Sequence, residues 1–304
     1  MHAADSSLTE RRNPRTVDID LATPLEIVDA IAGEDRSVPA AVAAERERIA
    51  EAVALAEAAF RAGGRLFYVG AGTSGRLGVL DAAECPPTFG TDPSMVQGLI
   101  AGGLPALTRA QEGAEDRPGD GAAAVRAAGV GPSDFVVGIA ASGTTPYVRG
   151  ALDAARQAGA RTAFLTCTPV ASDVVASVDV VIAPLVGPEV VTGSTRLKAG
   201  TATKLVLNMI STGAMIRIGK TYGNLMVDLR ATNAKLAARS ERIVSEVCGL
   251  SRADARAALD AAGGGVKVAI VMRARGVDRA EAERLLAESG GALRRIIGPP
   301  PATV

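Results

Sequence analysis

The chain has 304 residues, and its 33 basic and 33 acidic side chains give a formal net charge of zero. This length allows one large or two modest domains with an ample buried core. Balanced charge, 3% aromatic residues and no tryptophan argue against a nucleic-acid-binding surface, which needs basic groups and stacking rings, and against an electrostatic membrane partner.

Cysteine usage and apolar segments indicate the compartment. Cys85, Cys167 and Cys248 are far apart and odd in number, so they form neither a disulfide framework nor a zinc motif. Residues 1–20 lack the apolar core of a signal peptide, and the most apolar helical stretch, 205–216, is too short to span a bilayer. We therefore expect a cytoplasmic protein.

Histidine is nearly absent, because His2 is the only one in the chain. Acid–base chemistry would therefore fall to carboxylates, lysine, tyrosine or cysteine. No cluster of His, Asp or Glu has the spacing of metal ligands, so we expect neither a metal nor a cofactor.

The chain begins with polar residues, which predict an arm over 1–20. Helical periodicity follows over 24–32 and again over 38–62, where Gly63-Gly64 should end the second helix. A short β-rich apolar run over 66–69 then predicts the first strand.

That strand leads into the loop Gly70-Ala-Gly-Thr-Ser-Gly, and a helical pattern resumes over 76–83. A strand, a glycine turn and a helix N-terminus form an anion site, because the first N–H groups lack helical partners. Thr73 and Ser74 add neutral donors, whereas the lysine of a P-loop is missing. The loop indicates a small phosphorylated metabolite; the alternative is an ordinary turn with Ser74 as helix cap.

Glu84 lies at the far end of this helix, and Cys85-Pro86-Pro87 should stop it. A strand is expected over 95–100, with helices over 104–110 and 120–128. The acidic bend 111–116 joins these two helices. Its spacing alone is typical of a solvated surface turn.

The strand–loop–helix pattern of residues 66–83 occurs a second time. Here a strand over 134–140 is followed by a loop with Ser142, Thr144 and Thr145 and by a helix from Pro146 to Ala158. Two such units in one chain are unlikely to arise by accident. Two more buried strands, over 161–167 and 178–184, enclose a short helix. This alternation predicts a parallel sheet covered on both faces, with ligands beyond the C-terminal strand ends.

A third hydroxyl-rich loop, 190–204, opens a long helix to about Gly219. Arg196 and Lys198 supply positive charge near an anion or are solvated surface charges. The helix is apolar nearly all round, so we expect it in the core or at a subunit interface. Over 239–297, three or four amphipathic helices punctuated by glycine predict a small helical appendage.

Six segments carry a resemblance to a known family. They are Gly70-Ala-Gly-Thr-Ser-Gly-Arg-Leu-Gly, Asp81-Ala-Ala-Glu-Cys-Pro-Pro-Thr, Glu112-Gly-Ala-Glu-Asp, Gly138-Ile-Ala-Ala-Ser-Gly, Val191-Thr-Gly-Ser-Thr-Arg-Leu-Lys-Ala-Gly-Thr and Gly223-Asn-Leu-Met-Val-Asp. The chain resembles the N-acetylmuramic acid 6-phosphate etherases, which belong with the glucokinase regulatory protein to the sugar isomerase (SIS) group. The match covers nearly the whole chain, including Thr9-Glu10 in the arm.

The resemblance implies an α/β fold: a doubly wound parallel-sheet SIS sandwich with a small C-terminal all-helical appendage. The expected domains are an N-terminal arm with helices over 1–52, a phosphosugar-binding SIS domain over 53–220 and a helical region over 221–304. SIS domains typically dimerise, so a homodimer is expected.

The implied reaction cleaves the D-lactyl ether of N-acetylmuramic acid 6-phosphate in cell-wall recycling. The two family catalytic glutamates match Glu84 and Glu115, which overturns the surface-turn interpretation of Glu115. Our hypothesis is that Glu84 serves the lactyl oxygen and the added water, and that Glu115 handles the C2 proton. Partial desolvation would raise the pKa of both carboxyls toward neutrality.

The resemblance also implies a phosphate site built from neutral donors on the three hydroxyl-rich loops. Family members often have arginine where this chain has Thr144, which puts affinity in doubt but not reaction type. The expected phosphate-binding residues are Gly72, Thr73, Ser74, Ser142, Thr144, Ser194 and Lys198.

Two rival functions remain. An SIS-type aldose–ketose isomerase shares the phosphate loops and C2 deprotonation but needs no second acid at C3. A non-catalytic sugar-phosphate sensor is the other, although a pure binder has no use for Glu84 and Glu115 as paired carboxylates. Release of D-lactate by purified protein separates the three.

Overall fold

The computed structural model describes residues 8–229, 231 and 233–301. Backbone contacts divide the chain into two compact units. The first comprises the described residues up to Ala83 together with Ser94–Ser211, and the second comprises Glu84–Pro93 together with the described residues from Thr212 onward.

The first unit is built on a parallel five-stranded sheet in the order β2-β1-β3-β4-β5. The chain leaves β1 for β2 on one side and then returns to β3 on the other, which makes the β1–β3 boundary a topological switch point. This order confirms the doubly wound prediction. The strands are β1 (Leu66–Gly70), β2 (Val96–Ile100), β3 (Phe135–Ile139), β4 (Arg161–Leu165) and β5 (Val180–Ile182).

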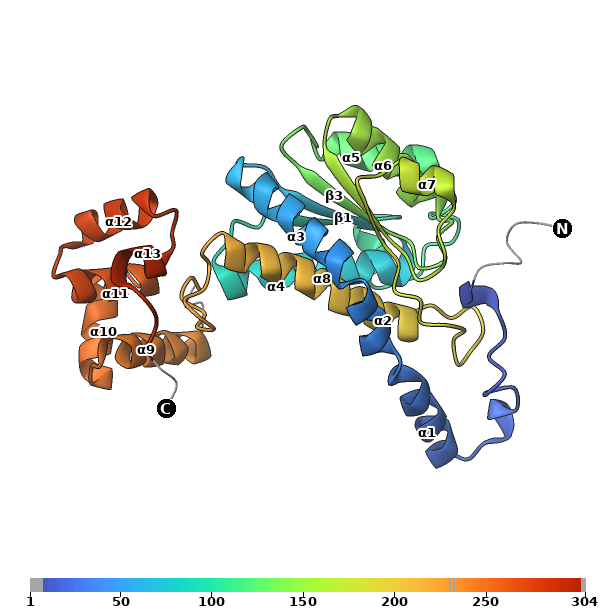
Figure 1. Ribbon diagram of the computed structural model, residues 1–304, viewed down its shortest axis with the longest axis horizontal. Helices are drawn as coiled ribbons and strands as arrows, with labels where there is room; N and C mark the ends of the chain where they lie inside the picture. The colour runs from blue at the N-terminus through green and yellow to red at the C-terminus, as the bar shows by residue number, and fades with distance from the viewer. Residues whose placement is uncertain (1–7, 230, 232, 302–304) are drawn as a thin grey trace. The chain divides into compact units, whose positions relative to one another are not determined.

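Helices cover both faces of this sheet (Figure 1). One side carries α5 (Pro118–Ala127), α6 (Pro146–Gln157) and α7 (Ser172–Ala176), and the other carries α3 (Arg46–Arg61), α4 (Gly72–Phe89) and α8 (Lys198–Arg217). Apolar side chains alternate between the faces, because successive strand residues point in opposite directions. Phe67 and Val69 join the core under α5 and α6, whereas the hydroxyl of Tyr68 reaches Leu207 on α8.

The prediction that Pro86 and Pro87 stop the fourth helix is wrong. Helix α4 continues through both prolines to Phe89. It also begins earlier than expected, at Gly72, so the glycine loop is short and Thr73 lies in the first helical turn. Proline costs a helix its own N–H bond, but near the C-terminus later donors close the final turn. The N–H of Gly90 does so by donating to the carbonyl of Pro86 at 2.9 Å.

Two other predicted helices also differ. The helix expected over 38–62 is interrupted at Glu45, whose backbone departs from helical geometry, giving α2 (Val38–Ala44) before α3. The Glu45 carboxylate accepts the N–H of Ala183. The helix expected over 104–110 is the short 3-10 helix η4 (Leu104–Leu107). Helix α1 (Pro24–Asp35) forms where expected.

The arm packs onto the first unit rather than standing apart from it. Short 3-10 helices form at η2 (Leu8–Glu10) and η3 (Ile19–Leu21). Thr9 is fully buried, and its carbonyl accepts the N–H of Gly193 in the third hydroxyl-rich loop. Thr16 is also buried and donates to the carbonyl of Val190.

Over the described residues 233–301 of the second unit, the chain forms five helices rather than the three or four predicted: α9 (Ala234–Cys248), α10 (Arg252–Ala261), α11 (Val266–Arg275), α12 (Arg279–Glu288) and α13 (Leu293–Ile297). Gly249 and Gly276 end α9 and α11 in the left-handed conformation that glycine adopts without strain. Leu236, Ile243 and Ile270 are among the residues of its separate apolar core. Among the described residues, no helix combines the length and apolar character needed to cross a membrane.

Candidate functional site

Two hydroxyl-bearing loops lie at the same edge of the sheet. Gly70 at the end of β1 is in register with Ile139 at the end of β3, and each strand is followed directly by one of the loops. The C-terminal edge at a switch point is where doubly wound sheets bind ligands. The structure thus places Ser74 and Ser142 at the same edge of the sheet.

The β1–α4 junction requires glycine. A Cβ on Gly75 would lie 2.6 Å from the carbonyl oxygen of Gly70, which is backbone and cannot move aside. Gly72 opens α4 with φ of +52°. Thr73 and Ser74 follow it, half-buried, beside N–H groups that lack helical partners.

The β3–α6 loop is held by its own hydroxyls. The Oγ atoms of Ser142 and Thr144 lie 3.3 Å apart, Ser142 is half-buried and Thr144 is exposed. Between them Gly143 has φ of +81°. Thr144 therefore presents a short neutral side chain at the end of this loop.

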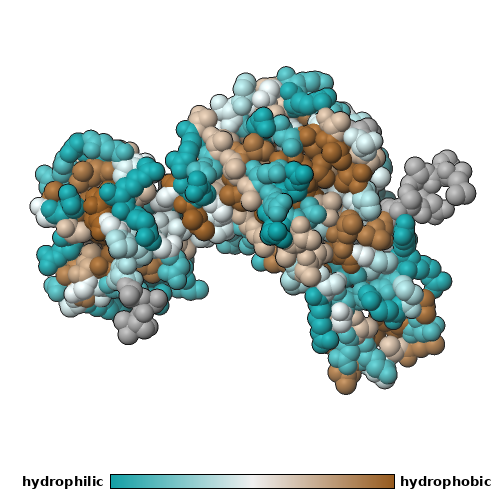
Figure 2. Space-filling view, viewed as in Figure 1, coloured by the Kyte–Doolittle hydropathy of each residue, from teal (hydrophilic) through white to brown (hydrophobic). Residues whose placement is uncertain are grey.

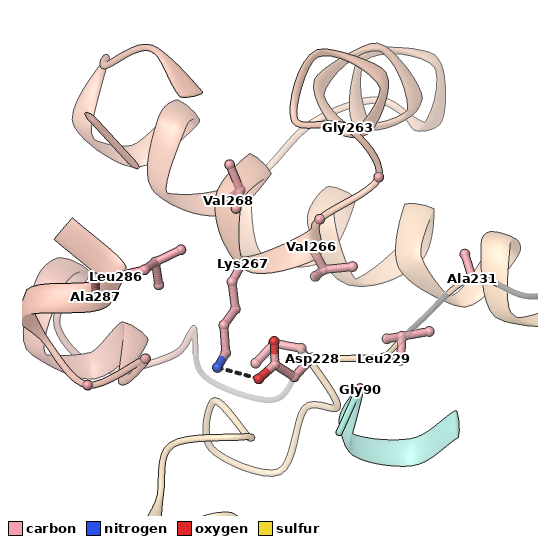
Figure 3. A pocket seen from close by; sticks show the side chains of 15 residues that line it. Gly90, Asp228, Leu229, Ala231, Gly263, Val266, Lys267, Val268, Leu286 and Ala287 are labelled. Carbon is pink, nitrogen blue, oxygen red and sulfur yellow. Dashed lines mark hydrogen bonds and ion pairs between the residues drawn. The ribbon is translucent and has the colours of Figure 1, made fainter. Parts of the chain in front are cut away.

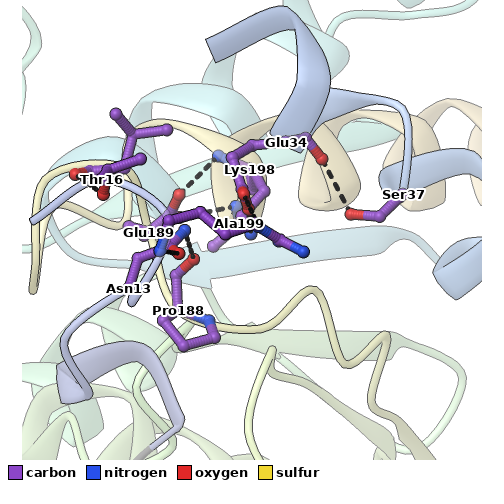
Figure 4. A network of polar contacts seen from close by, with 10 residues as sticks. Asn13, Thr16, Glu34, Ser37, Pro188, Glu189, Lys198 and Ala199 are labelled. Carbon is purple, nitrogen blue, oxygen red and sulfur yellow. Dashed lines mark hydrogen bonds and ion pairs between the residues drawn. The ribbon is translucent and has the colours of Figure 1, made fainter. Parts of the chain in front are cut away.

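The third loop, which carries Ser194, is fastened to a buried ionic network (Figure 4). Glu189 is fully buried, and its carboxylate accepts the N–H groups of Lys198 and Ala199, which begin α8. Burial raises the pKa of Glu189, while these backbone donors oppose that effect. A carboxylate is favoured there because a helix N-terminus is positive.

Lys198 points its ammonium into the same network. Its side chain is 1% exposed, and Nζ lies 2.6 Å from Oε2 of Glu34. The alternative that Lys198 is a solvated surface charge is therefore wrong, whereas Arg196 is exposed. Burial disfavours ionised Glu34, but hydrogen bonds from Arg15 and Lys198 outweigh burial and hold its pKa at about 2. A phosphate contact from Lys198 would compete with this ion pair.

The acidic bend lies next to the β1–α4 junction. A cavity of about 320 Å³ is lined by Gly72 and Arg76 on one side and by all of Gln111–Glu115 on the other. The carbonyl of Glu115 accepts the N–H of Tyr147 at 2.9 Å, which ties the bend to α6. Gly72 and Glu115, predicted separately from sequence, thus line one cavity.

Glu84 lies on α4 and belongs to the second unit. Its side chain is exposed, as is that of Glu115. The expectation that both carboxylates are partly desolvated is therefore wrong for the single chain. Glu84 and Glu115 belong to different units, and their action as a catalytic pair stays a prediction.

Sequence reasoning missed Arg76 and Glu34. The sequence places Arg76 in the helix and in the first family segment without a role in the site, although its position four residues after Gly72, on the same helix face, indicates one. Glu34 had no comparable signal, because it meets Lys198 from 164 residues away.

A second cavity, of about 730 Å³, lies within the second unit (Figure 3). Lys267 extends into it from α11 and donates to Asp228 at 2.8 Å, and Lys220 lies 3.0 Å from the same carboxylate. Gly263–Gly265 form part of its wall. None of the predicted site residues lines this cavity.

Comparison with known proteins gives concordant matches. Residues 47–156 match the model of the glucokinase regulatory protein N-terminal SIS domain. The chain is 56% identical over 290 residues to an N-acetylmuramic acid 6-phosphate etherase of Synechococcus elongatus, covering 95% of this chain and 94% of the relative. Proteins of the same name from Mesorhizobium japonicum and Serratia proteamaculans are 53% and 55% identical, covering 99% and 94% of this chain and 98% and 96% of the relatives.

Proposed function

The chain belongs to the N-acetylmuramic acid 6-phosphate etherase family, and we propose that it cleaves the D-lactyl ether of N-acetylmuramic acid 6-phosphate, giving N-acetylglucosamine 6-phosphate and D-lactate. Identity of 53–56% over nearly the full length of this chain and its relatives carries the proposal. The reaction is that of a carbon–oxygen lyase and would serve cell-wall recycling in the cytoplasm. The partner is a small phosphosugar.

The chemistry explains why two acidic side chains are needed. An alkyl ether resists direct displacement, because an alkoxide is a poor leaving group. When the sugar ring opens to its aldehyde, the C2 proton becomes acidic, since the resulting carbanion is delocalised as an enolate. Loss of that proton and then of the C3 oxygen is a β-elimination, and water adds back at C3 while a proton returns to C2.

Glu115 would remove and return the C2 proton, and Glu84 would protonate the departing oxygen and activate the water. A positioned general acid or base typically contributes about 10²- to 10⁴-fold in rate. Support for Glu115 comes from its place in the cavity beside Gly72. Support for Glu84 comes from its match to the family motif.

The phosphate would bind the hydroxyls of the three loops. Ser74 in the first turn of α4, and Ser142 before α6, sit at the C-terminal edge of adjacent strands. Neutral donors at helix N-termini suit a dianion without a permanent counter-charge. Gly72, Thr73, Thr144 and Ser194 would add donors, and Lys198 would add charge if it left Glu34.

The active form would be a homodimer. Leu25 and Val28 are 69% and 59% exposed, and their spacing of three residues places them on one face of α1. Leu21, at the end of η3, is 82% exposed. Figure 2 shows apolar surface over α1, and Met209 and Ile216 on α8 are also about half exposed. Exposed apolar rows of this kind are typical of interaction surfaces.

Turnover of purified protein tests the activity. With N-acetylmuramic acid 6-phosphate, we expect one D-lactate and one N-acetylglucosamine 6-phosphate per substrate consumed. Formation of a ketose phosphate with no D-lactate would replace the etherase with an isomerase. Binding of the substrate with no turnover would leave only a sensor.

A further inference from the structure

The cavity between the β1–α4 junction and the acidic bend contains one cation among the described residues that line it, Arg76. Two carboxylates, Glu112 and Glu115, line the same cavity. No ion pair joins Arg76 to either of them, or to any other carboxylate in the described part of the chain. A guanidinium without an acidic partner in a cavity of this kind can take an anionic ligand.

Arg76 is also fixed in place. It is half-buried, and its Nε donates to the carbonyl of Leu107, the last residue of η4, at 3.1 Å. Within the described chain, no hydrogen bond occupies its two terminal nitrogens. These nitrogens form the planar fork that pairs with carboxylates through two parallel hydrogen bonds.

We propose that Arg76 binds the carboxylate of the substrate's lactyl group, an inference that rests on the proposed function. The substrate carries two anionic groups, the phosphate on C6 and the carboxylate on the C3 ether. The planar fork of arginine pairs with either kind of group, so the surroundings of Arg76 decide between them. Arg76 is thereby a specificity-determining residue for muramate over sugars that lack the lactyl group.

The composition of the cavity favours the carboxylate over the phosphate. Of the residues assigned to the phosphate, Gly72 alone is among the described residues that line it, whereas Ser74, Ser142 and Ser194 are not. Glu115 does line it. Glu115 is assigned to the C2 proton, and C3 is bonded to C2, so the lactyl group lies next to the groups that Glu115 reaches. The phosphate is attached at C6, across the ring.

Charge balance gives a second reason. Glu112 and Glu115 would repel a lactyl carboxylate that entered the cavity with no counter-charge. Arg76, which lines the same cavity, supplies the positive counter-charge. It also leaves Glu115 able to accept a proton, since the two side chains are not paired with each other.

The first test changes the substrate and leaves the protein intact. Full-length wild type is assayed on the muramate 6-phosphate and on its carboxamide, in which the lactyl carboxylate is neutral. We expect kcat/KM to be about 10- to 100-fold lower for the carboxamide, the size of a lost charge-assisted bidentate pair. Equal cleavage of acid and amide overturns this inference alone. If the acid gives no D-lactate and the amide gives no lactamide, the proposed function is overturned.

The second test uses Arg76→Gln and Arg76→Lys, with Arg126→Gln on α5 as the control because Arg126 is exposed and outside the cavity. Arg76→Gln should raise KM for the acid about 10- to 100-fold and abolish the preference for acid over amide. Arg76→Lys should retain part of that preference.

Inhibition by N-acetylglucosamine 6-phosphate separates binding from folding. This product has the phosphate but no lactyl carboxylate, so its inhibition constant should be unchanged in Arg76→Gln. An inhibition constant that rises as much as KM would assign Arg76 to the phosphate or to the fold, and would overturn the inference.

Discussion

Glu34 shows how a single carboxylate connects three parts of the first unit. It accepts hydrogen bonds from Arg15 in the arm and from Lys198 at the start of α8, and it belongs itself to α1. Its side chain is 3% exposed. Charges buried this deeply are retained only when each has its partner, so the arm and the third loop depend on each other.

Replacement of Glu34 should therefore destabilise the fold strongly. In Glu34→Gln the buried ammonium of Lys198 loses its counter-charge, and removal of one partner from a buried pair costs about 3 kcal/mol. Urea denaturation measures the loss. The control is Glu47→Gln, whose exposed pair with Arg46 should contribute less than about 1 kcal/mol; a loss no larger than that of the control would contradict the account.

The same residue predicts a pH dependence. The pKa of Glu34 is lowered from 4.5 to about 2 in the folded chain, so its stabilising contribution is complete above pH 4.5 and is lost as pH falls toward 2. Free energies of unfolding for wild type and Glu34→Gln should thus converge over that interval. A difference between them that stays constant from pH 5 to pH 2 would show that the Glu34 charge is not involved.

Glu84 and Glu115 should be separable by isotope exchange. Glu84→Ala should lower D-lactate release by about 10²- to 10⁴-fold yet leave exchange of the C2 proton in heavy water, followed by NMR. Glu246→Ala, an exposed carboxylate on α9, serves as the control. Loss of C2 proton exchange together with lactate release would assign the C2 proton to Glu84 and reverse the assigned roles.

At the scale of elements, the β1–α4 junction is where backbone packing leaves no room for a side chain. Gly75→Ala should abolish folding or phosphosugar binding, because the new Cβ would meet the Gly70 carbonyl at 2.6 Å. Gly33→Ala in α1 is the matched control. Its Cβ meets nothing within 4 Å, so alanine should stabilise that helix by about 0.5–1 kcal/mol. Thermal melts and inhibitor titrations distinguish the two, and a Gly75→Ala protein that binds normally would refute the packing argument.

Elements with strong local signals were predictable. Strand β1, the helix opened by Pro146 and the glycine-ended helices of the second unit all follow from patterns within about fifteen residues. The errors arose where distant contacts decide. The helix expected over 38–62 is broken at Glu45, whose carboxylate holds the distant N–H of Ala183. Pro86 is accommodated because Gly90 closes the final turn.

In the candidate site, too, residues set by local patterns and fold class were predictable, whereas residues with distant partners were not. Ser74 and Ser142 follow strands whose ends are adjacent, so the fold class alone places them at one edge. Lys198 was ambiguous from sequence, since its partner Glu34 lies 164 residues away. Arg76 was missed because its cavity is completed by the bend at Gln111–Glu115, which sequence spacing does not place opposite α4.

For the whole molecule, the exposed apolar row of Leu21, Leu25 and Val28, on η3 and α1, predicts self-association. Light scattering should give the mass of two 30.7 kDa chains for wild type. Leu25→Glu should shift the equilibrium to monomer, because it places a charge in the centre of the row. Leu104→Glu is the control, being 81% exposed on η4 away from that row. A Leu25→Glu protein that remains dimeric would move the interface elsewhere.

The most direct measurement follows oxygen through the reaction. Purified wild type is incubated with N-acetylmuramic acid 6-phosphate in oxygen-18 water, and both products are analysed by mass spectrometry. Elimination followed by water addition at C3 predicts label in N-acetylglucosamine 6-phosphate at C3 and none in the D-lactate oxygen that came from the ether. Label in that lactate oxygen, with none at C3, would show cleavage on the lactyl side of the ether and contradict the mechanism.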